Sequence, residues 1–535
     1  MNLPPVSLGL DFGTESVRAI LVDGLGCQLG TGTSTYQHGQ ITNHLPETRQ
    51  ALPPHYALQS PNDWMESASE AVQSALRESK LDTNRIVGIG VDFTSCTMLP
   101  TLADGTPLCN VEAFRDQALA WPKLWKHHGA IEQTARMNQI AAARSESFLN
   151  RYGGLIGLEW FFPKMLETIE LAPKVAEAAE VWLEAGDWFV WQLVGGPPSS
   201  LPRSTCQAGY KALWASDSGY ASRDYLAAVH PKLLEAADQK MHGRLLSPGQ
   251  LAGLLQPSMA KHLGLPAGIA VSAAVIDAHA AVPGVGAADP GTLVMVMGTS
   301  SCHMLNSTQN KPVAGIAGLV KGGILPGLYG YETGQAAVGD AFAWLIKLLK
   351  EDGFDQISRE AKQLPPGADG VMCMDWMNGC RTPLMDGSLK GAFVGLTLGT
   401  TSAQLYRAIL EASAFGVRWI VQLLRDGGVP IHKAIATGGL PHHNPELIQI
   451  YADVLGLPIE VHPSQHGCAV GAAVLGMLAA GEEKSGFKSV SAAVSAMASV
   501  AACSQSVVQP QVVNVQEYDQ LYSKYRKLAE AIQQL

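Results

Sequence analysis

The sequence predicts an α/β protein made of two related domains, and three observations support this. Short runs rich in β-branched residues and glycine, such as IVGIGVDFT at 86–94, are typical of buried strands in a central sheet. Segments with helical spacing, such as 60–79, alternate with these runs. The pattern strand, Gly-Thr-x-Ser, strand occurs at 7–23 and again at 293–305. Internal repetition indicates two copies of one architecture, with a boundary near residue 285.

Length and composition agree with this prediction. The chain has 535 residues, enough for two to four domains, and we expect domains at residues 1–285 and 286–535. A content of 47% hydrophobic and 16% charged residues fills large cores and excludes a disordered protein. The formal net charge of −10 argues against nucleic acid as a partner.

The sequence also predicts a cytoplasmic protein that does not enter a membrane. Its nine cysteines are scattered without a C-x-x-C pair, which is typical of a reducing compartment. The first residues lack the basic segment and cleavage site of a signal peptide. The apolar stretches 267–288 and 489–508 are interpreted as a strand–turn–helix and a small-residue helix, because a membrane span needs about 20 strongly apolar residues.

The first domain is expected to open with a β-hairpin. Strand 7–11, the turn FGTES and the return strand 17–23 follow one another directly. The helix at 60–79 places Trp64 and Ala68 on one face. Further along, we predict a turn at 102–108 that enters another strand, an aromatic helical region at 157–196, a loop at 197–200 and a buried strand at 270–277.

The second domain repeats the hairpin and then continues with helices. The expected elements are strands at 293–297 and 302–305 around the turn 298–301, a strand at 433–439 that ends in a glycine pair, a helix at 445–455, a Gly/Ala helix at 466–478 and a closing amphipathic helix at 517–532.

The two repeated turns are candidate phosphate-binding sites. In the first, Gly13 and Thr14 offer backbone N–H and hydroxyl groups, which cradle phosphate, and Arg18 returns toward the same side. Asp11 ends the first strand, where a carboxylate can hold Mg²⁺, usually through water. A plain hairpin with a tight turn is an equally good interpretation of the first turn alone. The chain has no G-x-x-x-x-G-K-[ST], which excludes a P-loop enzyme.

The second repeated turn and a later glycine pair extend this candidate nucleotide site. Gly298 and Thr299 form the second turn. Gly438 and Gly439 end the strand at 433–439, where glycine lets the backbone approach an adenine or ribose closely. Asn444 could reach the base, although it is also an ordinary N-cap before Pro445, and the two roles are compatible.

Three ionisable residues are candidates for the acceptor side. Asp277 follows a buried strand, where it could accept the proton of an attacking hydroxyl, although a helix N-cap is the commoner role for such a residue. Lys211 and Glu332 are isolated charges in apolar or Gly-rich surroundings and could hydrogen-bond a polyol. Without context, a solvent-facing lysine is the preferred interpretation of Lys211.

The chain resembles the FGGY family of carbohydrate kinases over nearly its whole length. The resemblance rests on GLDFGTESVRA (9–19), VIDAHAAVPGVGA (275–287), VMGTSSC (296–302), MDWMNGCRTPLMDGSLKGAFVGLTLGTT (374–401) and TGGLPHHNPELIQIYADVLGLPI (437–459). It implies two actin-like ATPase domains of the ribonuclease H-like type, with ATP and sugar meeting in a central cleft.

The resemblance also implies roles for single residues. Asp277 is the catalytic base, and Asp11 organises Mg²⁺. The remaining implied contacts are Lys211, Glu332 and the backbone around Cys96 for the sugar, Thr14, Arg18 and Thr299 for the phosphates, and Gly439, His443 and Asn444 for the adenosine. Some relatives carry a second Asn where this chain has His443, which leaves that base contact open.

Within the family, DFTSCTMLP (92–100), AGYKALW (208–214) and GYETGQAAVGD (330–340) resemble members that phosphorylate L-ribulose. The implied reaction converts MgATP and L-ribulose to ADP and L-ribulose 5-phosphate, in arabinose breakdown. Three alternatives stay open: a kinase of D-ribulose or D-xylulose, an ATP-driven switch like Hsp70 or actin that phosphorylates no sugar, and a sugar-binding regulator without catalysis. A homo-oligomer is compatible with the sequence.

Overall fold

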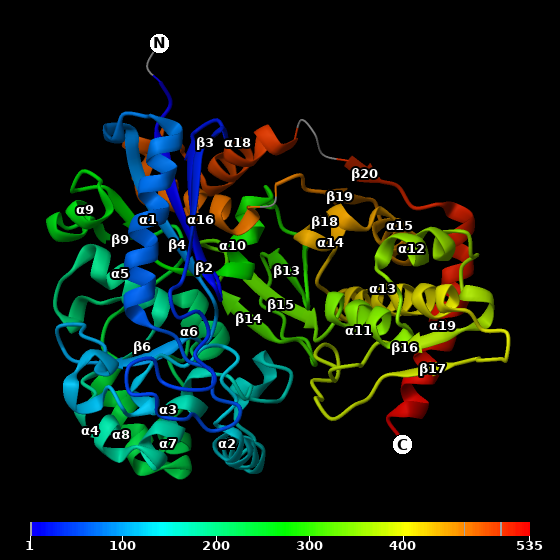
Figure 1. Cartoon of the computed structure of the whole chain (residues 1–535), viewed down its shortest axis with the longest axis horizontal. Helices are drawn as coiled ribbons and strands as arrows, with labels where there is room; N and C mark the ends of the chain where they lie inside the picture. The colour runs from blue at the N-terminus through cyan, green and yellow to red at the C-terminus, as the bar shows by residue number, and fades with distance from the viewer. Residues whose placement is uncertain (1–2, 465, 503–505, 535) are drawn as a thin grey trace.

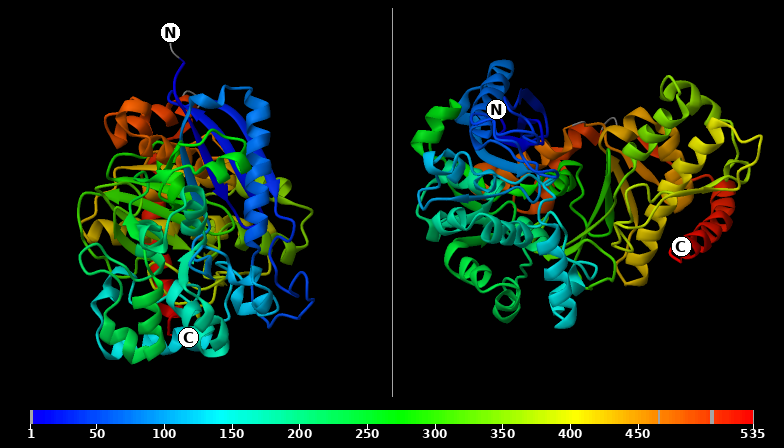
Figure 2. Two further views of the ribbon diagram at one scale, coloured as in Figure 1. Left: turned by 90° about the vertical axis from the view of Figure 1, so that its left-hand side faces the viewer. Right: turned by 60° about the horizontal axis from the view of Figure 1, so that its bottom comes forward.

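The structure is a computed structural model that describes residues 3–464, 466–502 and 506–534. Two seven-stranded mixed sheets form the centres of two lobes, which Figures 1 and 2 show side by side. Helices cover the sheets. The amino-terminal half of the chain supplies most of the first lobe, and the carboxy-terminal half supplies the second lobe together with α16 and α18 of the first.

The first sheet has the order β3-β2-β1-β4-β10-β9, with β11 paired to the end of β4. Strands β1, β2 and β3 are antiparallel neighbours, whereas β4 and β10 run parallel to β1. The strands are β1 Val6–Phe12, β2 Ser16–Asp23, β3 Gln28–Thr35, β4 Ile86–Phe93, β9 Leu251–Leu254, β10 Ala270–Ser272 and β11 Val275–Ile276.

The second sheet repeats this arrangement. Its order is β14-β15-β13-β12-β18-β19-β20, in which β12, β13 and β15 are antiparallel neighbours and β18 and β19 run parallel to β12. The internal repeat predicted from the sequence is therefore confirmed at the level of topology. The strands are β12 Thr292–Met297, β13 Ser301–Ser307, β14 Gly318–Lys321, β15 Tyr329–Gln335, β18 Lys433–Thr437, β19 Ile459–Val461 and β20 Ser506–Val508.

Two helices, α10 (Asp277–Gly284) and α16 (Gly467–Ala479), pack against each other between the sheets. Although α16 comes from the second half of the chain, it lies on β1 and β4 of the first sheet. Glycine makes this close approach possible: a Cβ on Gly9 would stand 1.9 Å from the carbonyl oxygen of Ala469, and one on Gly90 would stand 1.8 Å from that of Ala472. The Gly/Ala composition of α16 is thus a packing requirement.

The other helices of the first lobe lie beside its sheet or in an insertion between β4 and β9 that has its own apolar core. They are α1 Pro61–Ser79, α2 Ile131–Ala143, α3 Phe161–Leu171, α4 Pro173–Ala178, α5 Ala185–Val194, α6 Thr205–Lys211, α7 Arg223–Val229, α8 Pro231–Lys240 and α9 Pro257–Leu263, with the short strands β5 Met98–Thr101, β6 Val181–Glu184, β7 Pro202–Ser204 and β8 Arg244–Leu246.

The second lobe is built around the long helix α13 (Ser402–Asp426), which begins at a capping box formed by Thr401 and Gln404. The remaining elements after β15 are α11 Gly339–Leu349, α12 Phe354–Lys362, the hairpin β16 Met372–Met374 and β17 Ala392–Val394, α14 Gly439–His443, α15 Pro445–Leu455, α17 Gly481–Ser485, α18 Val490–Ala502 and α19 Val512–Ile532. Within the described residues, no helix combines the length and the apolar character needed to cross a bilayer.

Most predicted elements are confirmed, and four are corrected. The turn at 102–108 leads into the short helix Leu108–Asn110 and not into a strand, because the strand of this region, β5, lies before the turn. The aromatic region 157–196 contains β6 between its helices. The predicted strand 270–277 is two short strands, and Asp277 is the first residue of α10. The predicted helix 489–508 is α18, which spans Val490–Ala502, and residues 506–508 form strand β20 instead. Residues 503–505 lie outside the described residues.

Candidate active site

The first repeated turn closes the β1–β2 hairpin. The N–H of Gly13 donates to the carbonyl of Ser16 at 3.0 Å. Asp11 and Arg18 are register partners across the hairpin, and the Arg18 guanidinium donates to the Asp11 carboxylate at 2.8 Å. The hydroxyl of Thr14 accepts a hydrogen bond from the indole of Trp125 at 3.1 Å. The turn is therefore anchored, and it places one carboxylate and one guanidinium together.

The second repeated turn has the same construction in the second lobe. The N–H of Gly298 donates to the carbonyl of Ser300 at 2.9 Å, between β12 and β13. The carbonyl of Thr299 accepts from the N–H groups of Val338 and Asp340 at 2.9 and 3.1 Å, which ties the turn to the start of α11. Gly298 and Thr299 themselves are exposed.

Three carboxylates meet where neighbouring strands of the first sheet end. Asp11 on β1 is the register partner of Asp92 on the parallel strand β4, and Asp92 in turn lies beside Val275, two residues before Asp277. Asp92 is fully buried, and no N–H or O–H group within the described residues donates to either of its oxygens. Burial, followed by the charges of Asp11 and Asp277, raises the pKa of Asp92 well above its ordinary range.

Asp277 has the properties of a base that works near neutral pH. Its Oδ1 accepts a hydrogen bond from the N–H of Ala278 at 2.6 Å. Burial raises its pKa to about 7, and the charges of Asp11 and Glu332 add to the effect. A carboxylate with such a pKa can take up a proton at neutral pH. The sequence alternative of an N-cap residue is not what the structure has, because Ile276 occupies the cap position.

Lys211 and Glu332 form one buried ion pair. The Lys211 ammonium, at the end of α6, donates to both carboxylate oxygens of Glu332 on β15, at 2.9 and 3.0 Å. The two side chains are 7% and 3% exposed, so the interpretation of Lys211 as a solvent-facing lysine is wrong. Burial alone would raise the Glu332 pKa, but the charges of Lys211 and Arg381 outweigh it and hold that pKa well below its usual range.

Cys96 lies beside this pair in a conformation that is rare for a side chain other than glycine. Its φ is 57°, in the left-handed region, and its carbonyl accepts a hydrogen bond from the buried Lys164 ammonium at 2.7 Å. Burial raises the pKa of the Cys96 thiol to about 12, so the thiol stays neutral. The Lys164 ammonium also bonds the carbonyl of Leu124 at 2.8 Å, which fixes the loop that carries Cys96.

The glycine pair after β18 lies close to the protein's own backbone, and its approach to adenine or ribose stays a prediction. Gly438 has a φ of 95°, and a Cβ there would stand 2.5 Å from the Met297 carbonyl oxygen, so only glycine fits. Gly439 begins the short helix α14, which ends at His443, and both residues are exposed. Asn444 caps α15 by accepting from the Leu447 N–H at 3.1 Å.

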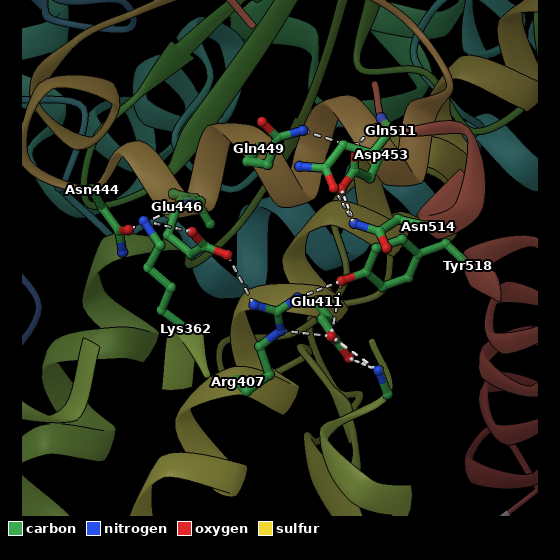
Figure 3. A network of polar contacts seen from close by, with 12 residues as sticks. Lys362, Arg407, Glu411, Asn444, Glu446, Gln449, Asp453, Gln511, Asn514 and Tyr518 are labelled. Carbon is green, nitrogen blue, oxygen red and sulfur yellow. Dashed lines mark hydrogen bonds and ion pairs between the residues drawn. The ribbon is translucent and has the colours of Figure 1, made fainter. Parts of the chain in front are cut away.

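Asn444 adjoins a network of polar contacts that holds the helices of the second lobe together (Figure 3). Its amide donates to the hydroxyl of Tyr406 at 3.2 Å, so both ends of the side chain have protein partners. Nearby, the buried Arg407 guanidinium bonds Glu411 at 2.8 Å, Glu446 at 3.1 Å and the hydroxyl of Tyr518 at 2.9 Å. These bonds join α13, α15 and α19, and they set the position of the Asn444 region.

The start of α16 lies next to both the glycine pair and the first hairpin. A Cβ on Gly467 would stand 3.5 Å from the hydroxyl of Thr437, the last residue of β18. Burial, and next the charge of Arg18, lowers the pKa of His466. The tertiary structure thus brings the end of β18 near the β1–β2 hairpin, although about 420 residues of chain separate them.

Two family models match the chain, one to each half. The model of the amino-terminal domain of the FGGY family of carbohydrate kinases matches residues 6–284, and the model of its carboxy-terminal domain matches residues 293–480. The chain belongs to the FGGY family of carbohydrate kinases. It is therefore an ATP-dependent sugar kinase, and the resemblance stated from the motifs is confirmed.

Similar proteins agree with this assignment. A ribulokinase from Bacillus licheniformis is 43% identical over 526 residues, which are 96% of this chain and 94% of the relative. A ribulokinase from Mycolicibacterium smegmatis is 41% identical over 98% of this chain and 93% of the relative. The xylulose kinase of Rhodospirillum rubrum superposes with a TM-score of 0.80 over 99% of both chains, at 23% identity, which confirms the two-domain fold.

Two residues that lie against the predicted site residues were not found from the sequence. Asp92 had a detectable signal, because β1 and β4 both end in Asp-Phe and the two phenylalanines stack with ring centroids 4.7 Å apart. Arg381 had no such signal, because it is 49 positions from Glu332 and no motif of the sequence links the two segments.

Proposed function

We propose that this kinase transfers the γ-phosphoryl group of ATP to L-ribulose, giving ADP and L-ribulose 5-phosphate. The substrate is supported by the ribulokinases that are about 40% identical over nearly the whole chain. The observation that carries the mechanism is the position of Asp277 at the start of α10. On one side, Val275 lies beside Asp92, the register partner of Asp11, and on the other, His279 of the same helix lies 3.4 Å from the Glu332 carboxylate.

In this mechanism Asp277 is the catalytic base. Its carboxylate accepts the proton of the sugar hydroxyl as the hydroxyl oxygen attacks the γ-phosphorus, and the bond from that phosphorus to the β–γ bridging oxygen breaks to release ADP. Lys211 donates to sugar oxygens and Glu332 accepts from sugar hydroxyls, while the backbone around Cys96 completes the sugar site. Because a ketopentose carries no charge, hydrogen bonds with these groups must hold and orient it.

The nucleotide is proposed to lie across both lobes. Its phosphates contact Gly13, Thr14 and Arg18 of the first hairpin and the exposed turn at Gly298 and Thr299 of the second. Its adenosine lies by Gly438, Gly439 and His443, with Asn444 close by. Since both ends of the Asn444 side chain already have protein partners, we expect Asn444 to position this region through α15 and not to bind the base alone.

The carboxylates of the first sheet suit Mg²⁺. Among the described residues there is no cluster of three or more His, Cys, Asp or Glu side chains arranged to hold a metal ion. Mg²⁺ in kinases, however, is usually held by one or two carboxylates, several waters and the substrate phosphates. Asp11 and the unpartnered oxygens of Asp92 fit that donor set, and they would hold Mg²⁺ there. When bound, the ion supplies positive charge that stabilises the phosphates of ATP.

The cellular location and the domain boundaries of the enzyme are also proposed. We propose that it works in L-arabinose breakdown in the cytoplasm, as two domains at 1–285 and 286–535. The eight cysteines among the described residues are all free, which suits a reducing compartment.

A coupled ADP-release assay across the four 2-ketopentoses tests the function. The highest kcat/KM is expected for L-ribulose, and the ADP rate with sugar should greatly exceed the rate without it. A higher kcat/KM for D-ribulose or D-xylulose would show that this sugar, and not L-ribulose, is the substrate. An ADP rate that ignores every ketopentose and polyol would instead favour an ATP-driven switch.

A further inference from the structure

The motif at 374–401 helped to identify the family but has no role in the mechanism above. Within it, Arg381 lies in the connection between β16 and β17. Its guanidinium Nη2 bonds Oε1 of Glu332, and its Nη1 donates to the sulfur of Cys302 at 3.4 Å. Arg381 therefore contacts Glu332 on β15, the carboxylate that we place in the sugar site.

The Glu332 carboxylate has basic side chains around it from three parts of the chain. Lys211 approaches from α6, Arg381 from the β16–β17 connection, and His279 Nε2 from α10 at 3.4 Å from Oε2. Burial lowers the pKa of His279, so that ring is neutral at neutral pH. Lys211 and Arg381 are thus the two cations that form ion pairs with the Glu332 carboxylate. Lys211 comes from the first half of the chain and Arg381 from the second.

This sharing leaves binding capacity for a sugar. An ammonium has three N–H donors. Within the described residues, the hydrogen bonds of the Lys211 ammonium go to the two Glu332 oxygens. Arg381 bonds the same Oε1, so Glu332 remains charged and oriented even when Lys211 turns a donor toward a sugar hydroxyl. A buried carboxylate that loses its partners carries a large desolvation cost, which Arg381 prevents.

We propose that Arg381 is a positioning residue of the sugar site, which holds Glu332 in the orientation that accepts sugar hydroxyls. The role rests on the proposed function, because it requires Glu332 to contact the sugar. Arg381 also contacts Cys302, which follows the second phosphate hairpin on β13. The contact joins the acceptor side to the hairpin that contains Thr299.

Steady-state kinetics with L-ribulose and ATP test this role in R381Q and R381K. We expect R381Q to raise the KM for L-ribulose at least about tenfold and the KM for ATP less than about twofold. R381K should recover part of the loss, since lysine restores the charge but lacks the planar fork of donors. R136Q is the matched control, because Arg136 also pairs with a glutamate, Glu170, but on the surface of α2 and α3.

A double-mutant cycle separates positioning from an independent role. If Arg381 acts through Glu332, the variant R381Q/E332Q should have a KM for L-ribulose within about twofold of E332Q alone. Additive losses would overturn the proposal, as would an equal rise in the KM for ATP or the same change in R136Q. If R381Q does not fold, the comparison of R381K/E332Q with E332Q alone decides the question by the same criterion.

The outcome also distinguishes this role from the function itself. A wild-type enzyme that phosphorylates none of the four 2-ketopentoses overturns both. A wild-type enzyme that phosphorylates L-ribulose, with an unchanged KM in R381Q, overturns only the role of Arg381.

Discussion

Replacing Asp277 by Asn tests the chemistry most directly. The side chain keeps its volume and can still accept the Ala278 N–H bond through its amide oxygen, but it can no longer take up a proton. Loss of a general base lowers kcat by about 10²–10⁴-fold. We therefore expect Asp277→Asn to lose turnover by this factor while the KM for L-ribulose changes little.

The raised pKa of Asp277 predicts the pH dependence of the wild-type enzyme. With a pKa of about 7, the ionised fraction is about one eleventh at pH 6 and about ten elevenths at pH 8. Only the ionised form can accept a proton, so the rate rises with pH through this window. We expect kcat/KM for L-ribulose to increase about tenfold from pH 6 to pH 8, and the residual rate of Asp277→Asn to stay flat.

The assay is the coupled ADP-release reaction at saturating MgATP, with coupling enzymes in excess at each pH. Asp375→Asn is the control, because Asp375 is another buried carboxyl, whose pKa is raised to about 6 by burial, and it bonds Tyr525 in the second lobe. This variant should keep the increase between pH 6 and pH 8. Near-normal turnover in Asp277→Asn, or a wild-type profile that is flat from pH 6 to pH 8, would refute the assignment.

Four further variants test other parts of the site and the network that supports it. Asp11→Ala should lower kcat by at least about 10²-fold and raise the Mg²⁺ concentration needed for half-maximal rate, because Asp11 is a proposed ligand of the metal. Lys211→Ala and Glu332→Ala should each raise the KM for L-ribulose at least about tenfold, or about 1.4 kcal/mol, with less change in the KM for ATP. Arg407→Met should lower the free energy of unfolding by about 3–5 kcal/mol in urea titrations, because it leaves a buried carboxylate without its cation, whereas Lys362→Met, at a side chain 65% exposed, should cost less than about 1 kcal/mol.

Each of these variants has a contradicting result. Wild-type kinetics for Asp11→Ala at saturating Mg²⁺ would remove Asp11 from the metal site. Loss of ATP affinity with intact sugar affinity in Lys211→Ala and Glu332→Ala would move these residues to the nucleotide side. Equal unfolding free energies for Arg407→Met and Lys362→Met would show that the network in Figure 3 contributes little to stability.

The proposed nucleotide side of the site could be stated from the sequence because its parts are local. Gly13 with Thr14, and Gly298 with Thr299, lie in turns between adjacent strands, and the strands and the turn are contiguous in the chain. The same holds for the glycine pair after β18. A short segment carries both its own backbone preference and its own donors, so the pattern of residues is sufficient to indicate the site.

The acceptor side was only partly predictable, because its properties come from contacts between distant segments. Lys211 and Glu332 are 121 positions apart, and Arg381 is 49 positions from Glu332. Charge alone cannot tell a buried pair from two exposed side chains, and the solvent-facing interpretation of Lys211 was reasonable until burial was known. Asp92 was missed because its position beside Asp11 depends on the parallel register of β1 and β4.

The sequence by itself determined the fold class, the repeat, the family and the strand-end residues, since each depends on composition, periodicity or a contiguous motif. Only the tertiary structure decided which of those residues lie close enough to form ion pairs or to shift one another's pKa. It pairs β1 with β4, seats α16 against both, and brings Arg381 to the Lys211–Glu332 pair. Burial then sets the pKa of Asp277, because the cost of removing a carboxylate from water depends on everything packed around it.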